Sequence, residues 1–340
     1  MGYGSQAGAI VVGAQSAPGT PNSTLATDGI GLRLTSGSLA GNRELLVTDP
    51  EIGGGRDTSD AYLGAVSFGG DYEMYVRFKA VAFFLYHAFG VKASVARVGD
   101  TAVFDHTLTP TDSSQLPMFT VYERISNNLE RFLYTDAVVN TFHLEADANG
   151  FLTSTVGIIA RLMNAGAAAV DPTDVMDNTS LVVGTNITLT YDGVTVPAKS
   201  FSFDVNNNIT DDNFFLGSFF LGDMTAQNRE VTASMTVEHT SASMMRQALL
   251  GTPGATAVGG LTTKKPLVIT CEAYENIPGT TANAKYKLEL ELPKVIFSPF
   301  AFEPSGADPL ENDVEMTAVR PDIAAPVATA VVSNEFEEAA

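Results

Sequence analysis

A strict alternation of polar and apolar side chains between residues 71 and 79 most constrains what this chain can fold into. Side chains of a β-strand point alternately to opposite faces of a sheet, so this pattern predicts a strand that is buried on one face. A helix-like run from Val81 to Phe89 follows the strand, and Gly90 comes next. Glycine at that position favours a helix end, because it adopts the left-handed conformation without strain.

The same pattern recurs in the second half of the chain. Residues 230–238 alternate in the same way, and a second helix-like run ends at Gly251. Gly251 lies 161 residues after Gly90, and the same separation joins Val76 to Val237. A strand and a helix end that recur in one register predict two diverged copies of a single unit.

Further alternating segments flank the matched core in both halves. A short segment precedes each strand, at residues 30–39 and 201–209, and about three apolar alternating segments follow each helix-like run. Strands that follow one another in this way are typical of antiparallel sheets. The sequence therefore predicts a mainly β protein with two tandem antiparallel β-sandwich or barrel units, each with one short α-helix.

The ends of the chain differ in composition from its middle, since both are rich in small residues. We expect an N-terminal arm at residues 1–28, a first unit at 29–170, a second unit at 171–320 and a C-terminal arm at 321–340. Such arms either fray or become ordered on a neighbouring subunit, and the composition leaves both outcomes open.

Two long segments separate the paired strands of each half. Residues 40–70 carry three consecutive glycines, and residues 210–228 carry four phenylalanines. Loops of this length are uncommon unless they are functional or disordered. The phenylalanines either pack under their own sheet or contact a neighbouring subunit. The candidate contact residues are Gly53, Gly54, Gly55, Phe214, Phe215, Phe219 and Phe220.

The formal net charge is −20, from 39 acidic and 19 basic residues. An acidic chain is a poor nucleic-acid ligand, because affinity for phosphates comes mainly from lysine and arginine. Three explanations remain open: ordinary solubility, repulsion of DNA that passes nearby, and adaptation to high salt.

The sequence carries no pattern that indicates catalysis, a cofactor or a metal site. Cys271 is the only cysteine and lies in an apolar run, so we expect a buried, inert thiol. The four histidines have no metal-binding spacing, and no nucleophile elbow or phosphate loop occurs. Residues 204–215 begin like a calcium loop, but Ile209 and Phe215 stand where glycine and glutamate are required. We therefore expect a protein that is not an enzyme.

The chain also lacks the patterns of membrane and secreted proteins. Its first residues do not form a basic stretch followed by an apolar one, and no apolar run approaches the ~20 residues of a membrane helix. We expect a soluble protein that is made in the cytoplasm.

The order of these segments resembles that of the tail tube proteins of long-tailed, siphovirus-type viruses of bacteria or archaea. Residues 32–39 follow an arm rich in proline, glycine and threonine, and residues 200–209 resemble the segment in which the family restarts its unit. Residues 288–295, with the sequence LELELPKV, resemble a late strand of the family. The resemblance covers about residues 20–320.

The resemblance implies a structural virion protein that assembles into stacked rings. The rings would form the hollow tail tube, and the viral genome would pass through its β-barrel lumen. Six units usually complete a ring, so two units per chain imply a homotrimer with pseudo-hexameric symmetry. The implied partners are further copies of the chain, the tape measure, tail terminator and distal tail proteins, and double-stranded DNA that passes without specific binding. No membrane and no cofactor are implied.

The resemblance also assigns roles to the alternating strands and the long segments. The polar side of the matched strands would face the lumen, although the same pattern would also suit a sheet that faces bulk water. Arg77 and Lys79, the two cations on this side, would pair with Glu73 or with an acidic side chain of a neighbouring subunit. The long segment between the first strands would contact the next ring. The expected lumen residues are Asp71, Glu73, Tyr75, Arg77, Lys79, Glu230, Thr232, Ser234, Thr236 and Glu238.

A second function stays open at this point. Two β-sandwiches without catalytic residues also suit a decoration protein, or a receptor-binding or glycan-binding protein, of a virion or cell surface. An enzyme on a β scaffold would need convergent catalytic groups, which the sequence does not indicate.

Overall fold

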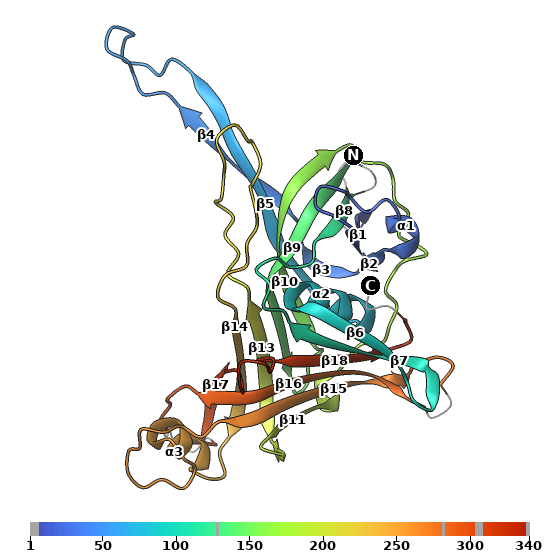
Figure 1. Cartoon of the computed structure of the whole chain (residues 1–340), viewed down its shortest axis with the longest axis vertical. Coiled ribbons are helices and arrows are strands. Elements are labelled where there is room, and N and C mark those ends of the chain that lie inside the picture. Colours follow the sequence, from blue (N-terminus) through green and yellow to red (C-terminus); the bar gives the residue numbers. More distant parts are fainter. Residues whose placement is uncertain (1–6, 127–128, 281–282, 303–308, 338–340) are drawn as a thin grey trace.

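The computed structural model describes residues 7–126, 129–280, 283–302 and 309–337. Within these residues the chain is mainly β, as the sequence predicts, and its eighteen strands join in one hydrogen-bonded network. The molecule is elongated, and a β-hairpin projects from one end of its long axis (Figure 1). None of the described helices is long and apolar enough to cross a membrane.

The described elements fall into two halves. The first half contains β1 (Ala9–Ala14), α1 (Leu25–Asp28), β2 (Ile30–Leu32), β3 (Leu34–Gly37), β4 (Ala40–Val47), β5 (Ala61–Tyr75), α2 (Phe78–Phe89), β6 (Gly90–Arg97), β7 (Asp100–Pro110), β8 (Phe119–Ile125), β9 (Glu130–Asp147) and β10 (Thr153–Ala165). The second half contains a 3-10 turn η2 (Gly184–Asn186), β11 (Ile187–Tyr191), β12 (Val194–Val196), β13 (Ala198–Asn206), β14 (Glu230–Glu238), α3 (Ser243–Leu250), β15 (Lys265–Asn276), β16 (Lys285–Phe297), β17 (Glu311–Ala318) and β18 (Thr329–Asn334).

The strand pairings repeat between the halves. The first half pairs β1 with β2 and β8, β9 with β8 and β10, and β5 with β10 and β3. The second half pairs β11 with β12 and β15, β16 with β15 and β17, and β14 with β17 and β13. The repeated pairings support the duplication. The hairpin of β6 and β7 is inserted after α2, whereas no strand is named between α3 and β15 in the described chain.

Both predicted helix ends are present. Gly90 and Gly251 have φ values of 100° and 95°, and their N–H groups donate to the carbonyl oxygens of Tyr86 and Gln247. Glycine is favoured at both positions because a side chain would strain this left-handed backbone. Helix α2 begins three residues earlier than the sequence predicts, at Phe78.

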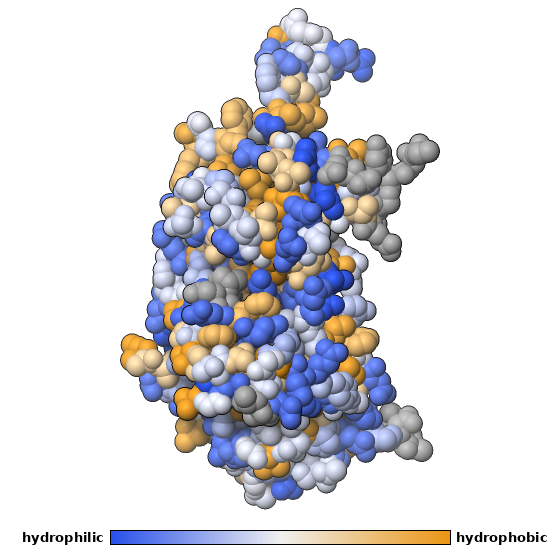
Figure 2. Space-filling model, turned by 90° about the vertical axis from the view of Figure 1, so that its right-hand side faces the viewer, coloured by the Kyte–Doolittle hydropathy of each residue, from blue (hydrophilic) through white to orange (hydrophobic). Residues whose placement is uncertain are grey.

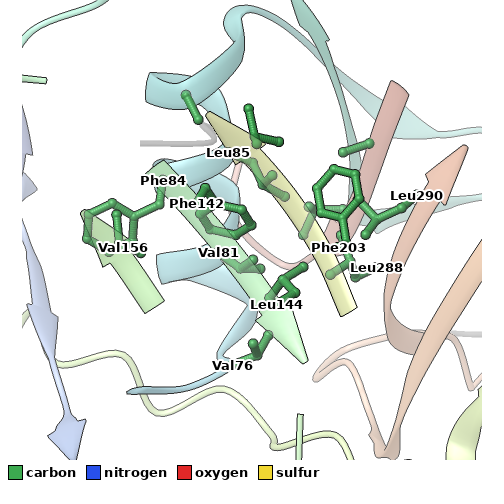
Figure 3. Close-up of a cluster of buried hydrophobic side chains, with 14 of the residues drawn as sticks. Val76, Val81, Phe84, Leu85, Phe142, Leu144, Val156, Phe203, Leu288 and Leu290 are labelled. Atoms are coloured by element: carbon green, nitrogen blue, oxygen red, sulfur yellow. The ribbon is translucent and has the colours of Figure 1, made fainter. Parts of the chain in front are cut away.

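One hydrophobic core joins the two halves. Helix α2 lies almost fully buried, and its Val81, Phe84 and Leu85 lie close to side chains of β9, β13 and β16 (Figure 3). Phe142 and Phe203 are buried at the boundary between the halves. Because both halves contribute to this core, we expect them to unfold together.

The predicted arms contain strands that belong to the sheets. In the N-terminal segment, Val11 and Val12 of β1 are fully buried, and β1 pairs with β2 and β8. In the C-terminal segment, β18 lies between β7 and β16. The arm prediction is therefore wrong for these two strands, whose apolar side chains fill the core. Residues 1–6 and 338–340 of the predicted arms lie outside the described residues, and the division at residues 29, 171 and 321 stays a prediction.

Candidate functional site: a polar sheet face and an apolar end

A continuous polar face runs across six neighbouring strands, β5, β10, β9, β13, β14 and β17, and so across both halves of the chain. One row across it aligns Tyr75, Thr153, Glu145, Ser202, Ser234 and Glu315. The intervening side chains point into the core. We call the following set the polar face: Asp71, Glu73, Tyr75, Thr141, His143, Glu145, Asp147, Thr153, Thr155, Gly157, Ser200, Ser202, Asp204, Asn206, Glu230, Thr232, Ser234, Thr236, Glu238, Glu311, Asp313, Glu315 and Thr317.

The polar face is acidic. It holds ten carboxylates and one histidine but no lysine or arginine. Lys199, outside the set at the start of β13, forms ion pairs with Glu238 and Glu311 at the border of the face. The centre of the face is lined by small hydroxyls, with Ser202 and Ser234 hydrogen-bonded at 2.9 Å, around a groove of about 410 Å³. Such a surface offers a phosphate backbone few cations to bind.

The two halves meet on this face where β9 pairs with β13. We call this pairing the seam. His143 of β9 lies 2.5 Å from the carboxylate of Asp204 on β13, measured from Nδ1 to Oδ1, and its Nε2 lies 3.4 Å from Glu145. The hydrogen bond with Asp204 raises the pKa of His143 above its ordinary value of 6.5, although partial burial opposes the shift.

The seam should therefore become weaker as the pH rises. A group whose pKa is raised by folding stabilises the fold fully below the unfolded-state pKa, here about 6.5, and loses that contribution as the pH rises through the folded-state pKa. We expect His143→Gln to lower the free energy of unfolding by less than about 1 kcal/mol near pH 5.5, because the pair is half-exposed. Urea unfolding should show a smaller difference near pH 8.5. A difference that grows with pH would contradict the assignment.

Two of the residues expected on the polar strand leave it. β5 ends at Tyr75, Arg77 is the residue before α2, and Lys79 lies within the helix. Arg77 donates to the carbonyl oxygen of Thr179, and the Lys79 ammonium lies 4.9 Å from the ring centroid of Phe336. The prediction that the strand continues to residue 79 is therefore wrong. Neither cation extends the row of Asp71, Glu73 and Tyr75, and their lumen role stays untested.

The segment predicted as a long loop at residues 40–70 is instead a projecting hairpin. β4 pairs with residues 61–69 of β5, and the hydrogen bond from the Thr48 N–H to the Asp60 carbonyl closes the turn at 3.0 Å. Gly53 and Gly55 near the tip have positive φ, with open space around both. Below the tip the hairpin presents apolar surface (Figure 2), to which Leu45, 58% exposed, and Tyr62, 61% exposed, contribute.

The loop that carries the four phenylalanines contacts the base of this hairpin through Phe219 and Phe220. We call residues 213–222 the Phe loop. The Val66 N–H of β5 donates to the Phe219 carbonyl at 2.8 Å, and the Arg43 guanidinium lies 5.9 Å from the Phe219 ring centroid. The rings of Phe215 and Phe219 remain 56% and 63% exposed, so the loop does not tuck under its own sheet. Both predicted contact segments thus lie at one end of the molecule, with exposed apolar side chains on the hairpin below its tip and on the Phe loop.

The described residues hold neither a metal-binding cluster nor a reactive thiol. Among the described residues, no three histidine, cysteine or acidic side chains gather as a metal site would require. Asp204, the first residue of the calcium-like segment, lies in β13 and pairs with His143. Cys271 is fully buried, and burial raises the pKa of its thiol, so it is inert.

Sequence reasoning found part of the polar face and missed its centre. The residues of β10, β9, β13 and β17 on this face were not named as site residues, although residues 201–209 and the alternating segments after each helix-like run predicted strands there. Knowing which strands are neighbours was the missing information. Only the pairing of β9 with β13 brings the predicted rows of both halves onto one surface.

The family model described as phage tail tube protein matches residues 5–318. None of the curated proteins compared with the chain matches it.

Proposed function

Since the chain belongs to the phage tail tube protein family, and is therefore a structural component of a virion tail, we propose that three copies form a ring with the polar faces directed inward. Rings stack into the hollow tail tube of a long-tailed virus, and the genome leaves through it. The observation that carries this proposal is the continuity of the polar face across both repeats. A sheet that already joins two similar units side by side suits a barrel of six such units.

The charge of the polar face supports passage of DNA without adhesion. Its carboxylates repel phosphates, and its serines and threonines offer only neutral hydrogen bonds. The projecting hairpin and the Phe loop form the surface for the next ring, because apolar side chains exposed at one end call for a partner. The tape measure, tail terminator and distal tail proteins are the partners proposed for the ends of the tube, after synthesis in the host cytoplasm. Nothing in the described part of the chain favours the decoration or glycan-binding alternative.

Reversing charge on the polar face tests this orientation. We expect tubes of the variant Glu230→Lys with Glu315→Lys to retain about tenfold more double-stranded DNA at low salt than wild-type tubes, with the excess lost as salt rises. Both side chains are exposed. The matched control is Glu275→Lys with Glu291→Lys, which has the same net charge and exposed positions outside the face. Co-sedimentation of labelled DNA measures the effect, and equal retention by both variants would contradict an inward-facing polar surface.

A further inference from the structure

The internal repeat shows which edges of the chain lack a partner. In the second half, β13 pairs with β14 on one side and, through the seam, with β9 on the other. Its counterpart in the first half is β3, which pairs with β5 as β13 pairs with β14. Leu34 lies opposite Met74 and Ser36 opposite Glu73, with a register shift at the intervening residue. Phe201 lies opposite Met235 and Ser202 opposite Ser234, without a shift between them. Met74 and Glu73 of β5 each lie 161 residues before their counterparts Met235 and Ser234 on β14. β3 is therefore the structural equivalent of β13.

The outer side of β3 is open where that of β13 is covered. Thr35, Ser36 and Gly37 are exposed, whereas the matched part of β13 is buried or half-buried between β14 and β9. An unprotected strand edge is a template for another strand, and proteins normally cover or blunt it. β3 carries no proline or charged side chain that would do so. The backbone N–H and C=O groups on its outer edge are therefore available to pair with another strand.

The repeat also identifies the strand that would cover it. In the first half, Phe142 of β9 pairs with Val156, and the chain continues from Phe142 into the seam. In the second half, Phe297 of β16 pairs with Met316 at the equivalent place, and the Ser298 N–H continues the ladder by donating to Glu315. By their position after this pair, residues 298–302 correspond to residues 143–147, although the described ladder with β17 ends at Ser298 and Phe300 stacks on His239. They are half-buried or exposed and hold no named strand.

We propose that β3 of one copy pairs with residues 298–302 of the next copy, which repeats the seam between chains. This inference rests on the proposed ring and names the contact that closes it. Transferring the register of the seam places Ser36 opposite Phe300, as Ser202 lies opposite Glu145 within the chain. Pro299 takes the place of Leu144 and has no N–H, so the ladder loses at most one hydrogen bond there. The contact is head-to-tail, and three repetitions close it.

Paired cysteines test this contact, although Phe300→Cys removes a half-buried ring that stacks on His239 with centroids 5.5 Å apart. In Ser36→Cys with Phe300→Cys, oxidation of the assembled protein should convert most of the chain into a covalent trimer and no larger product, because directly opposite residues suit a disulfide. Each single variant should give no trimer. The positive control is Ser202→Cys with Glu145→Cys, which should form a disulfide within one chain. The native Cys271 is buried and does not interfere.

The outcomes separate this inference from the proposed function. A covalent trimer supports both. Rings seen by electron microscopy, with the control disulfide formed and no covalent trimer, would overturn the proposed strand pairing and leave the tube intact. A covalent product that stops at six chains would overturn three chains per ring. If the wild-type protein forms no ring at any concentration, the proposed function and this inference both fail.

Discussion

Replacing Phe214, Phe215, Phe219 and Phe220 with serine is expected to abolish tube growth while the protein still folds. Phe215 and Phe219 are more than half exposed in the single chain and Phe214 and Phe220 more than one-third, so all four keep apolar surface that a partner could bury. In a stack, buried aromatic anchors commonly contribute ~2 kcal/mol each to an interface. Losing even one such contribution would raise the concentration needed for assembly roughly 30-fold, since each 1.4 kcal/mol is about tenfold.

Sedimentation and thermal unfolding separate the two effects. We expect the variant to sediment as small species with a midpoint of unfolding within a few degrees of the wild type. Val98→Ser is the control, because Val98 is fully exposed between β6 and β7, away from the hairpin end. Unfolding of the isolated variant chain would show that the four rings are core residues and that the interface assignment is wrong.

Arg161→Met is expected to destabilise the fold by about 3–5 kcal/mol, because it leaves a buried charge without its partner. The Asp136 carboxylate is fully buried in β9 and accepts hydrogen bonds from Arg161 Nε at 2.8 Å, from the Gln15 side chain at 2.8 Å and from the Gly19 N–H at 2.7 Å. Through Gln15 and Gly19, these hydrogen bonds hold the segment that follows β1 against β9.

A double variant identifies the cause of that loss. Asp136 has a φ of 57°, which asparagine tolerates well, so Asp136→Asn removes the charge with little backbone strain. If the unpaired charge is responsible, Arg161→Met with Asp136→Asn should be more stable than Arg161→Met alone. Urea unfolding measures both. Equal stability of the two variants would assign the loss to packing of the arginine side chain instead.

The alternation of polar and apolar residues in the sequence predicted the strands that are buried on one face only. β13, β14 and the last parts of β5 and β9 alternate because one side of each packs on the shared core. β4 gave no such signal, since all eight of its residues are exposed in the projecting hairpin. Without a buried face, a strand leaves no alternation in the sequence.

The error at residues 76–79 has a specific cause. Val76, Phe78 and Ala80 are all buried, so the alternation of the strand continues across the start of α2. A helix buried on nearly all sides imposes no period of its own, so the sequence could not mark the point at which the strand ends. Long-range pairing, such as that of β18 with β7, leaves no local signal either.

Cryo-electron microscopy of the assembled particle tests the central claim most directly, through its rotational symmetry and the identity of the side chains that line the channel. We expect a hollow tube with three chains and six similar units in each ring, and with Glu145, Ser202 and Ser234 facing the lumen. A ring of six chains, polar faces directed outward, or a protein that stays monomeric at high concentration and salt would contradict it.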